Sequence, residues 1–315
     1  MGSVIIGSGR ALPARIVTND ELSEIVDTTD EWIVPRTGIH TRHVAIEETC
    51  TDLGAQAALR ALGLEEGGWQ REAGAIEAAS LDMIICPTLT ADTHFPSEAA
   101  RIRERIGATN AVCYDMSCAC SGCVYGLSTA DLIMAGAAFA RQEAARTGTP
   151  LRCNDVRRVL VVAAERLSKL VDWEERATCI LFGDGAGAAL VEWGANYPSL
   201  HAVLGCRGNS EVLYVPGVNT AAPPHVHMDG QSVFRFAVEA VPRCAREVLD
   251  RAGLTPEDID LFVFHQANQR IIDFAVKKLG IYPARCPGNI ERTGNTSAAS
   301  VPLLLDELVG GGAIT

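Results

Sequence analysis

The stretch YDMSCACSGC, residues 114–123, decides the fold because it joins a strand-like run to a long helix through a turn of small residues. Residues 111–116 are typical of a buried strand, and residues 122–143 are typical of a helix rich in small side chains. Cys120 is therefore expected near a helix N-terminus. The unpaired backbone amides there carry partial positive charge and favour a thiolate, so we expect the Cys120 thiol to attack a thioester near neutral pH.

The rest of the chain repeats this alternation of short apolar runs and helical patterns. It favours an α/β fold with a buried, largely parallel sheet. Ser97, directly after Pro96, is expected to cap one helix. A change of composition at residues 193–199 predicts a boundary between an N-terminal unit, 1–192, and a C-terminal unit, 193–315. Further strands are expected at 81–86, 158–163, 180–190 and 261–264, and further helices at 98–106, 233–252 and 270–279.

The composition indicates a globular protein without a nucleic-acid partner. Of its 315 residues 48% are hydrophobic, enough to bury a substantial core. A net charge of −12 argues against nucleic-acid binding, because phosphates require a dominant basic surface. No uninterrupted apolar run of about 18 residues and no signal peptide is visible, so we expect a soluble, cytoplasmic protein that does not enter a membrane. The cysteines are odd in number and irregularly spaced, which indicates reduced thiols.

Two other interpretations of the cysteine-rich turn remain open at this point. Cys118, Cys120 and Cys123 resemble part of a metal site, but a structural zinc site needs a second matched pair, and none follows at a usable spacing. The three thiols are also compatible with a purely structural set of buried cysteines. We expect no bound metal here.

Two further segments place polar side chains where a catalyst would need them. His265 follows LFVF at the end of an expected buried strand, where a polar side chain is costly unless it is hydrogen-bonded or functional. Taken alone, it is equally compatible with a satisfied core histidine. The run GNTSAASVP, residues 294–302, is another small-residue turn that enters a helix, and it carries Asn295. Its Asn-Thr-Ser triplet also matches the glycosylation pattern, which a cytoplasmic chain would not use.

Together these segments resemble the β-ketoacyl-[acyl carrier protein] synthase III family of the thiolase superfamily. The resemblance begins at VDTTDEWI (26–33) and RTGI (36–39), includes LFGDGAGA (181–188), and extends over nearly the whole chain. It implies an α/β, thiolase-like fold of two pseudo-symmetric halves in five layers (α-β-α-β-α). The nucleophile would come from the first half, and the histidine and asparagine from the second. It also implies a homodimer without a prosthetic group.

The resemblance also implies a reaction. Cys120 would take an acyl group from acyl-CoA, and malonyl-acyl carrier protein would then lose carbon dioxide and attack the acyl-cysteine, which initiates fatty acid biosynthesis. His265 and Asn295 would donate hydrogen bonds to the malonyl thioester carbonyl as charge develops. Two alternatives stay open: acyl transfer to an oxygen or nitrogen of another metabolite, and a non-catalytic acyl-binding subunit. A dinucleotide-binding protein is disfavoured, because the glycine-rich runs lack the G-x-G-x-x-G pattern.

Three groups of further site residues follow from the resemblance. The first would bind coenzyme A, with Trp32 offering an aromatic face to adenine and arginines pairing with phosphates. The second would shape the acyl pocket, where Phe95 would reach across a dimer interface. The third, a basic stripe, would dock the acidic carrier protein. Their members are Thr28, Trp32, Arg36, Arg176, Gln231, Phe234 and Arg270 for coenzyme A; Phe95 and Cys123 for the acyl pocket; and Arg235, Arg270, Lys277 and Lys278 for docking.

Several of these residues also have a simpler explanation. Trp32 is compatible with a core position, Arg36 and Arg176 with solvated charges, and the basic stripe with an ordinary exposed helix face. Phe95 is compatible with an aromatic that anchors a loop.

Family members continue for about two more strands beyond this sequence, so we expect the C-terminal half to lack its last strands.

Overall fold

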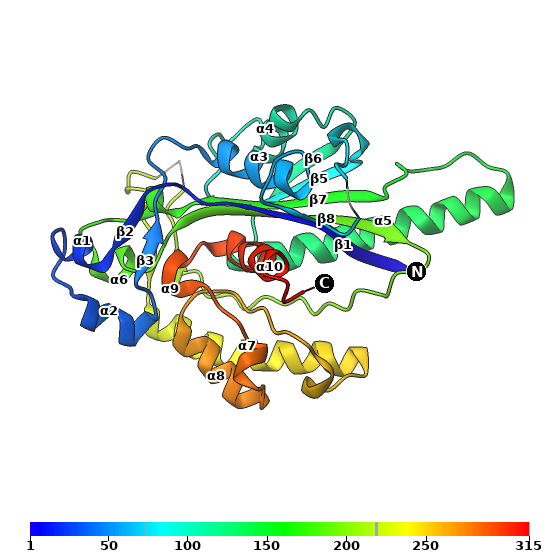
Figure 1. Cartoon of the computed structure of the whole chain (residues 1–315). Coiled ribbons are helices and arrows are strands. Elements are labelled where there is room, and N and C mark those ends of the chain that lie inside the picture. Colours follow the sequence, from blue (N-terminus) through cyan, green and yellow to red (C-terminus); the bar gives the residue numbers. More distant parts are fainter. Residues whose placement is uncertain (73, 218–219, 315) are drawn as a thin grey trace.

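The computed structural model describes residues 1–72, 74–217 and 220–314. Its centre is a six-stranded sheet with the order β4-β1-β8-β7-β5-β6 (Figure 1). Two small ribbons, β2 with β3 and β9 with β10, lie outside it. The strands are β1 (Gly2–Ala11), β2 (Ile16–Thr18), β3 (Thr41–His43), β4 (Trp69–Gln70), β5 (Met83–Pro87), β6 (Val112–Met116), β7 (Arg158–Arg166), β8 (Asp184–Gly194), β9 (Leu213–Tyr214) and β10 (His227–Met228).

The sheet is mixed, so the prediction of a largely parallel sheet was wrong. β5 pairs in parallel with both β6 and β7, whereas β8 runs antiparallel to β7 and to β1. The cause is the connection between β7 and β8, which leaves Arg166 and returns to its direct partner Asp184 at the same end of the sheet. A return at the same end makes the strands antiparallel, whereas a parallel pair needs a crossover.

The helices cover both faces of this sheet. Figure 1 shows α3 and α4 on one face, α5 and α10 on the other, and α7 and α8 in a further layer beyond α10. The expected helices at 98–106, 122–143, 233–252 and 270–279 are confirmed, and the Ser97 hydroxyl accepts from the Ala100 N–H as the predicted cap. The helices are α1 (Asn19–Ser23), α2 (Asp30–Thr37), α3 (Cys50–Ala61), α4 (Glu98–Ile106), α5 (Gly122–Thr147), α6 (Arg176–Cys179), α7 (Gly230–Ala252), α8 (Gln269–Leu279), α9 (Ile290–Thr293) and α10 (Ser300–Gly310).

The expected strand at residues 261–264 is not formed in the described chain, and this prediction was wrong. No strand pairs with the segment there, so side-chain and loop contacts hold it instead. The Phe262 N–H donates to the Arg285 carbonyl at 2.8 Å. The fully buried Gln266 donates to the Phe264 carbonyl at 2.8 Å and accepts from the Asn289 N–H at 3.1 Å. An apolar run alone does not make a strand, because a strand also needs a backbone partner.

Helix α5 is long and apolar enough to cross a membrane by length and composition. It packs against β5 and β7, and Met134 and Ala137 belong to a buried apolar cluster with Ile85 and Val161. A face buried in this way is explained by the core of the fold, so we assign α5 as a core helix.

Candidate active site

Cys120 lies in a short turn between strand and helix, as the sequence predicted. β6 ends at Met116, a 3-10 turn (η2, Ala119–Ser121) follows, and α5 begins at Gly122. Ala119 has a φ of 44°, a left-handed conformation that is rare for a residue with a side chain. Such conformations concentrate at functional sites, where the surrounding structure holds them in place.

The electrostatic environment of Cys120 opposes the expected thiolate. Burial raises the pKa of the Cys120 thiol to about 11, although a nearby Ser297 hydroxyl acts in the opposite direction. Removal from water is the largest effect on this thiol and outweighs the hydrogen bonds that act in the opposite direction. The free thiol is therefore protonated near neutral pH.

Asn295 is held by the backbone on both sides. Its N–H donates to the Leu181 carbonyl at 2.8 Å, and its carbonyl accepts from the Gly183 N–H at 3.0 Å. Its side-chain Oδ1 accepts from the Ser297 N–H at 2.9 Å. This bond orients the side-chain amide. The Nδ2 group makes no hydrogen bond to any of the described residues. Asn295 thus presents a fixed donor.

His265 lies at the end of the segment that Gln266 holds. Its Nδ1 is 2.5 Å from the Ser300 hydroxyl. Its Nε2 is buried and has no hydrogen-bond partner among the described residues. Burial lowers the pKa of His265 to about 4, so the ring is neutral near pH 7. A neutral ring with one unpartnered nitrogen suits a contact to a substrate.

The segment from Asn295 to Ser300 brings the three predicted residues together. Its turn η6 (Ser297–Ala299) packs directly on η2, which carries Cys120. Ser300 at the start of α10 contacts His265, and Ser297 contacts Asn295. Ser297 has a φ of 50°, the second left-handed non-glycine residue in the described chain. Two strained turns thus face one another at the site.

Sequence reasoning missed Glu165, a buried carboxylic acid beside this cluster. Its Oε2 accepts from the Thr90 hydroxyl at 2.7 Å and from the Leu89 N–H at 3.1 Å, while Oε1 has no regular partner among the described residues. Burial raises the pKa of Glu165 to about 7, and the Ser297 hydroxyl lowers it in part. The signal was present: a charged pair, Glu165 and Arg166, directly follows the apolar run at residues 159–164.

Four of the residues expected to bind coenzyme A lie together at one edge of the fold. The Arg36 and Arg176 guanidinium carbons each lie 4.4 Å from the centre of the Trp32 ring. Arg176 also donates to the Asp27 carbonyl at 2.8 Å, beside the buried Thr28 hydroxyl, which has no partner among the described residues. One aromatic face and two cations form a site suited to a nucleotide phosphate.

The other expected coenzyme A contacts and the basic stripe lie on α7 and α8. Arg270 lies 5.2 Å from the ring centre of Phe234, so the two helices meet at this pair. Gln231 is exposed at the start of α7. The expected docking residues are all exposed: Arg235, Arg270, Lys277 and Lys278.

The two residues expected at the acyl pocket differ in exposure. Phe95 is 87% exposed on the loop before α4. Cys123 is buried in the first turn of α5, and burial raises its pKa to about 12. In the described chain no group of three His, Cys, Asp or Glu side chains is placed to hold a metal ion.

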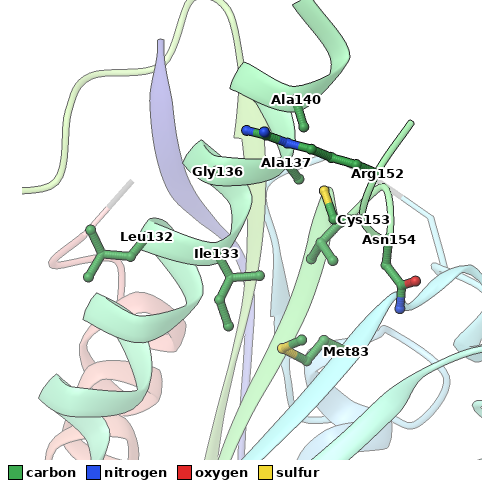
Figure 2. Close-up of a pocket in the computed structure, with 10 residues that line it drawn as sticks. Met83, Leu132, Ile133, Gly136, Ala137, Ala140, Arg152, Cys153 and Asn154 are labelled. Atoms are coloured by element: carbon green, nitrogen blue, oxygen red, sulfur yellow. The ribbon is translucent and has the colours of Figure 1, made fainter. Parts of the chain in front are cut away.

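A cavity of about 450 Å³ lies elsewhere, between the middle of α5 and residues 152–156 (Figure 2). Leu132, Ile133 and Arg152 are among its lining residues, and Cys120 is not. It is therefore separate from the candidate site.

Several solved structures of synthases share this architecture. The chain superposes on 3-oxoacyl-[acyl-carrier-protein] synthase III from Aquifex aeolicus with a TM-score of 0.81 and 38% identity, covering 100% of this chain and 92% of that one. The corresponding enzyme from Thermus thermophilus gives a TM-score of 0.84 at 38% identity, covering 99% and 91%. The likeness confirms the thiolase-like α/β fold.

Sequence comparison agrees. The family model described as 3-oxoacyl-[acyl-carrier-protein] synthase III matches residues 148–208, and the model of its C-terminal part matches residues 249–315. Synthase III of Clostridium acetobutylicum is 41% identical over 98% of this chain and 90% of its own length. That of Caldanaerobacter subterraneus is 42% identical with the same coverage. The chain therefore belongs to the β-ketoacyl-[acyl-carrier-protein] synthase III family, condensing acyltransferases that initiate fatty acid biosynthesis.

Proposed function

We propose that this chain joins an acyl group from acyl-CoA to malonyl-acyl carrier protein, with Cys120 as nucleophile and His265 and Asn295 as hydrogen-bond donors. The observation that carries the proposal is the position of the Asn295–Ser300 segment, which contacts the Cys120 turn and His265 together. Family membership supports the reaction class.

In the first half-reaction, the Cys120 sulfur attacks the acyl-CoA carbonyl. The bond between that carbonyl and the coenzyme A sulfur breaks, and the thiol proton ends on coenzyme A. The left-handed turn at Ala119 places Cys120 just before the first residue of α5, where the positive end of the helix dipole stabilises the developing negative charge.

In the second half-reaction, the malonyl thioester loses carbon dioxide. The electron pair of the broken bond moves toward the thioester carbonyl, where Asn295 Nδ2 and His265 Nε2 donate hydrogen bonds. Each such donor is worth about 3 to 4 kcal/mol of transition-state stabilisation. The carbanion attacks the acyl-cysteine, the carbon–sulfur bond breaks, and the Cys120 thiolate takes up a proton.

The surrounding residues divide between the two substrates. Thr28, Trp32, Arg36 and Arg176 would bind the coenzyme A nucleotide, and Gln231, Phe234 and Arg270 would line its approach. Arg235, Arg270, Lys277 and Lys278 would dock the carrier protein; their exposure on an acidic protein supports this role. Phe95 and Cys123 would set the acyl pocket.

We further propose a cytoplasmic homodimer with a unit boundary between residues 192 and 193. The support for a dimer is that β6 is an edge strand with no partner on its outer side in the described chain, and that large apolar side chains lie on the molecular surface: Phe95, Leu132 and Phe139 are 87%, 67% and 56% exposed. A second copy that covers this surface would bring Phe95 toward the partner's acyl pocket. Sedimentation at micromolar concentration tests this assembly.

The test of the reaction is intact-protein mass spectrometry after incubation with a panel of acyl-CoA thioesters, followed by peptide mapping. An acyl adduct on Cys120, absent in Cys120→Ala, is the expected result. We then expect the acylated protein to release carbon dioxide when malonyl-acyl carrier protein is added. A Cys120 adduct that is passed to an amine or alcohol without carbon dioxide release would favour acyl transfer to another acceptor. No adduct with any donor would overturn the proposal.

A further inference from the structure

The hydroxyl of Ser300 has one proton and two lone pairs to satisfy in a buried place. Ser300 is 2% exposed at the first position of α10. The Gln266 N–H donates to its oxygen at 3.4 Å, and His265 Nδ1 lies 2.5 Å away. In the part of the chain that the structure describes, Nδ1 is the one acceptor within hydrogen-bond distance of the Ser300 proton.

Two arrangements of protons are available to this pair. If Nδ1 carries the ring proton and donates it to Ser300, the serine proton is buried without an acceptor, which costs about 1 to 3 kcal/mol. If Ser300 donates to Nδ1, the serine proton has its acceptor and the ring proton lies on Nε2, which is without a partner among the described residues in either arrangement. The hydrogen bond made by one ring nitrogen sets the protonation of the other.

We propose that Ser300 is a positioning residue that fixes His265 as the Nε2–H tautomer. In this form Nε2 is a hydrogen-bond donor and has no free lone pair, so it does not remove a proton from Cys120. The unpartnered, buried Nε2 atom is then a donor held ready for a substrate oxygen. The low pKa of His265 agrees, because a second ring proton is disfavoured near pH 7.

The functional consequence rests on the reaction proposed above and differs between its two halves. Acyl transfer to Cys120 does not use the His265 proton and proceeds without Ser300. Carbon dioxide loss from the malonyl thioester needs a donor on Nε2 and slows when the tautomer is no longer fixed. Loss of one buried hydrogen bond corresponds to a decrease of about tenfold to a hundredfold.

The test compares Ser300→Ala with Ser300→Thr, which keeps the hydroxyl. Ser8→Ala is the matched control: Ser8 is also buried, and its hydroxyl donates at 2.7 Å to Asp306 of the same helix α10. Each variant is first acylated on Cys120, and the isolated acyl-enzyme is then mixed with malonyl thioester in a single turnover. The tautomer of His265 is assigned in each free protein from its side-chain ¹⁵N chemical shifts.

We expect Ser300→Ala to acylate within about twofold of the wild-type rate, to lose about tenfold to a hundredfold in carbon dioxide release, and to show a mixed His265 tautomer. Ser300→Thr restores the rate and the Nε2–H signature, and Ser8→Ala retains both. A wild-type protein with the proton on Nδ1 would overturn the inference, as would an unchanged ¹⁵N spectrum in Ser300→Ala. If wild type fails to acylate, the proposed function fails, while the ¹⁵N spectra still decide the tautomer.

Discussion

The Thr90 hydroxyl donates a 2.7 Å hydrogen bond to Oε2 of Glu165. The Arg166 N–H in turn donates to the Thr90 oxygen at 2.8 Å, so the loop after β5 is fastened to the end of β7. Because Glu165 is fully buried and lies next to Ser297 and Cys120, its charge is part of the site as well as of the fold.

Replacing Glu165 by glutamine is expected to change how stability depends on pH. Burial raises the pKa of Glu165 from 4.5 to about 7, so the folded protein holds this proton over a range in which the unfolded chain releases it. The stability that Glu165 provides in its protonated form is fully present below pH 4.5 and is lost as the pH rises through 7. Relative to wild type, Glu165→Gln should gain up to about 3 kcal/mol between pH 5 and pH 8.

Urea unfolding at several pH values measures this difference. His265 acts with the opposite sign, because burial lowers its pKa from 6.5 to about 4, and its contribution grows as pH rises through that range. The His265 contribution is common to both proteins and cancels in the comparison. A stability difference that stays constant with pH would contradict the raised pKa of Glu165.

Removing the Trp32 side chain is expected to weaken binding of the coenzyme A nucleotide. The Arg36 and Arg176 guanidinium carbons each lie 4.4 Å from the centre of the Trp32 ring. Stacking of a base on an aromatic ring is worth about 1 to 3 kcal/mol. Trp32→Ala should therefore raise KM for acyl-CoA about tenfold and leave kcat nearly unchanged.

The control for Trp32 is a shorter substrate. Acyl-pantetheine lacks the nucleotide, so Trp32→Ala should use it as well as wild type does. Equal losses with both substrates would indicate damage to the fold instead of a lost nucleotide contact.

Two glycine-to-alanine substitutions should have opposite effects on stability. A Cβ atom on Gly9 of β1 would lie 2.4 Å from the Ala57 carbonyl oxygen of α3, so Gly9→Ala should lose at least about 1 to 3 kcal/mol. Gly136 in α5 is exposed and has no atom within 4 Å of that position, so Gly136→Ala should gain about 0.5 to 1 kcal/mol. Chemical denaturation of the two variants beside wild type checks the signs.

Alkylation should show that the free Cys120 thiol is protonated near neutral pH. Burial raises its pKa to about 11, so the iodoacetamide rate at Cys120 should rise about tenfold per pH unit between pH 7 and 10. Peptide mapping separates Cys120 from exposed Cys153, which reports reagent access. A Cys120 rate that levels off near pH 7 would show that the helix N-terminus dominates after all.

The sequence by itself determined the elements around the nucleophile. The strand–turn–helix pattern placed Cys120 correctly between β6 and α5, because apolar periodicity and small residues are local properties of the chain. The motif order also identified the family, and the comparisons confirmed it. The same reasoning wrongly predicted a strand at residues 261–264 and a largely parallel sheet. Strand formation and strand direction both depend on which segment of the chain pairs with the strand, and local sequence does not contain that information.

Only the tertiary structure decided the protonation and orientation of the site. Ser297 and Ser300 appear in the sequence as small residues of a turn, and their contacts with Cys120 and His265 come from segments far apart in the chain. The helix N-terminus suggested a thiolate at Cys120, but burial by the packed turns sets the pKa of the free thiol higher. Desolvation depends on everything that surrounds a group in three dimensions, and a sequence lists only its neighbours along the chain.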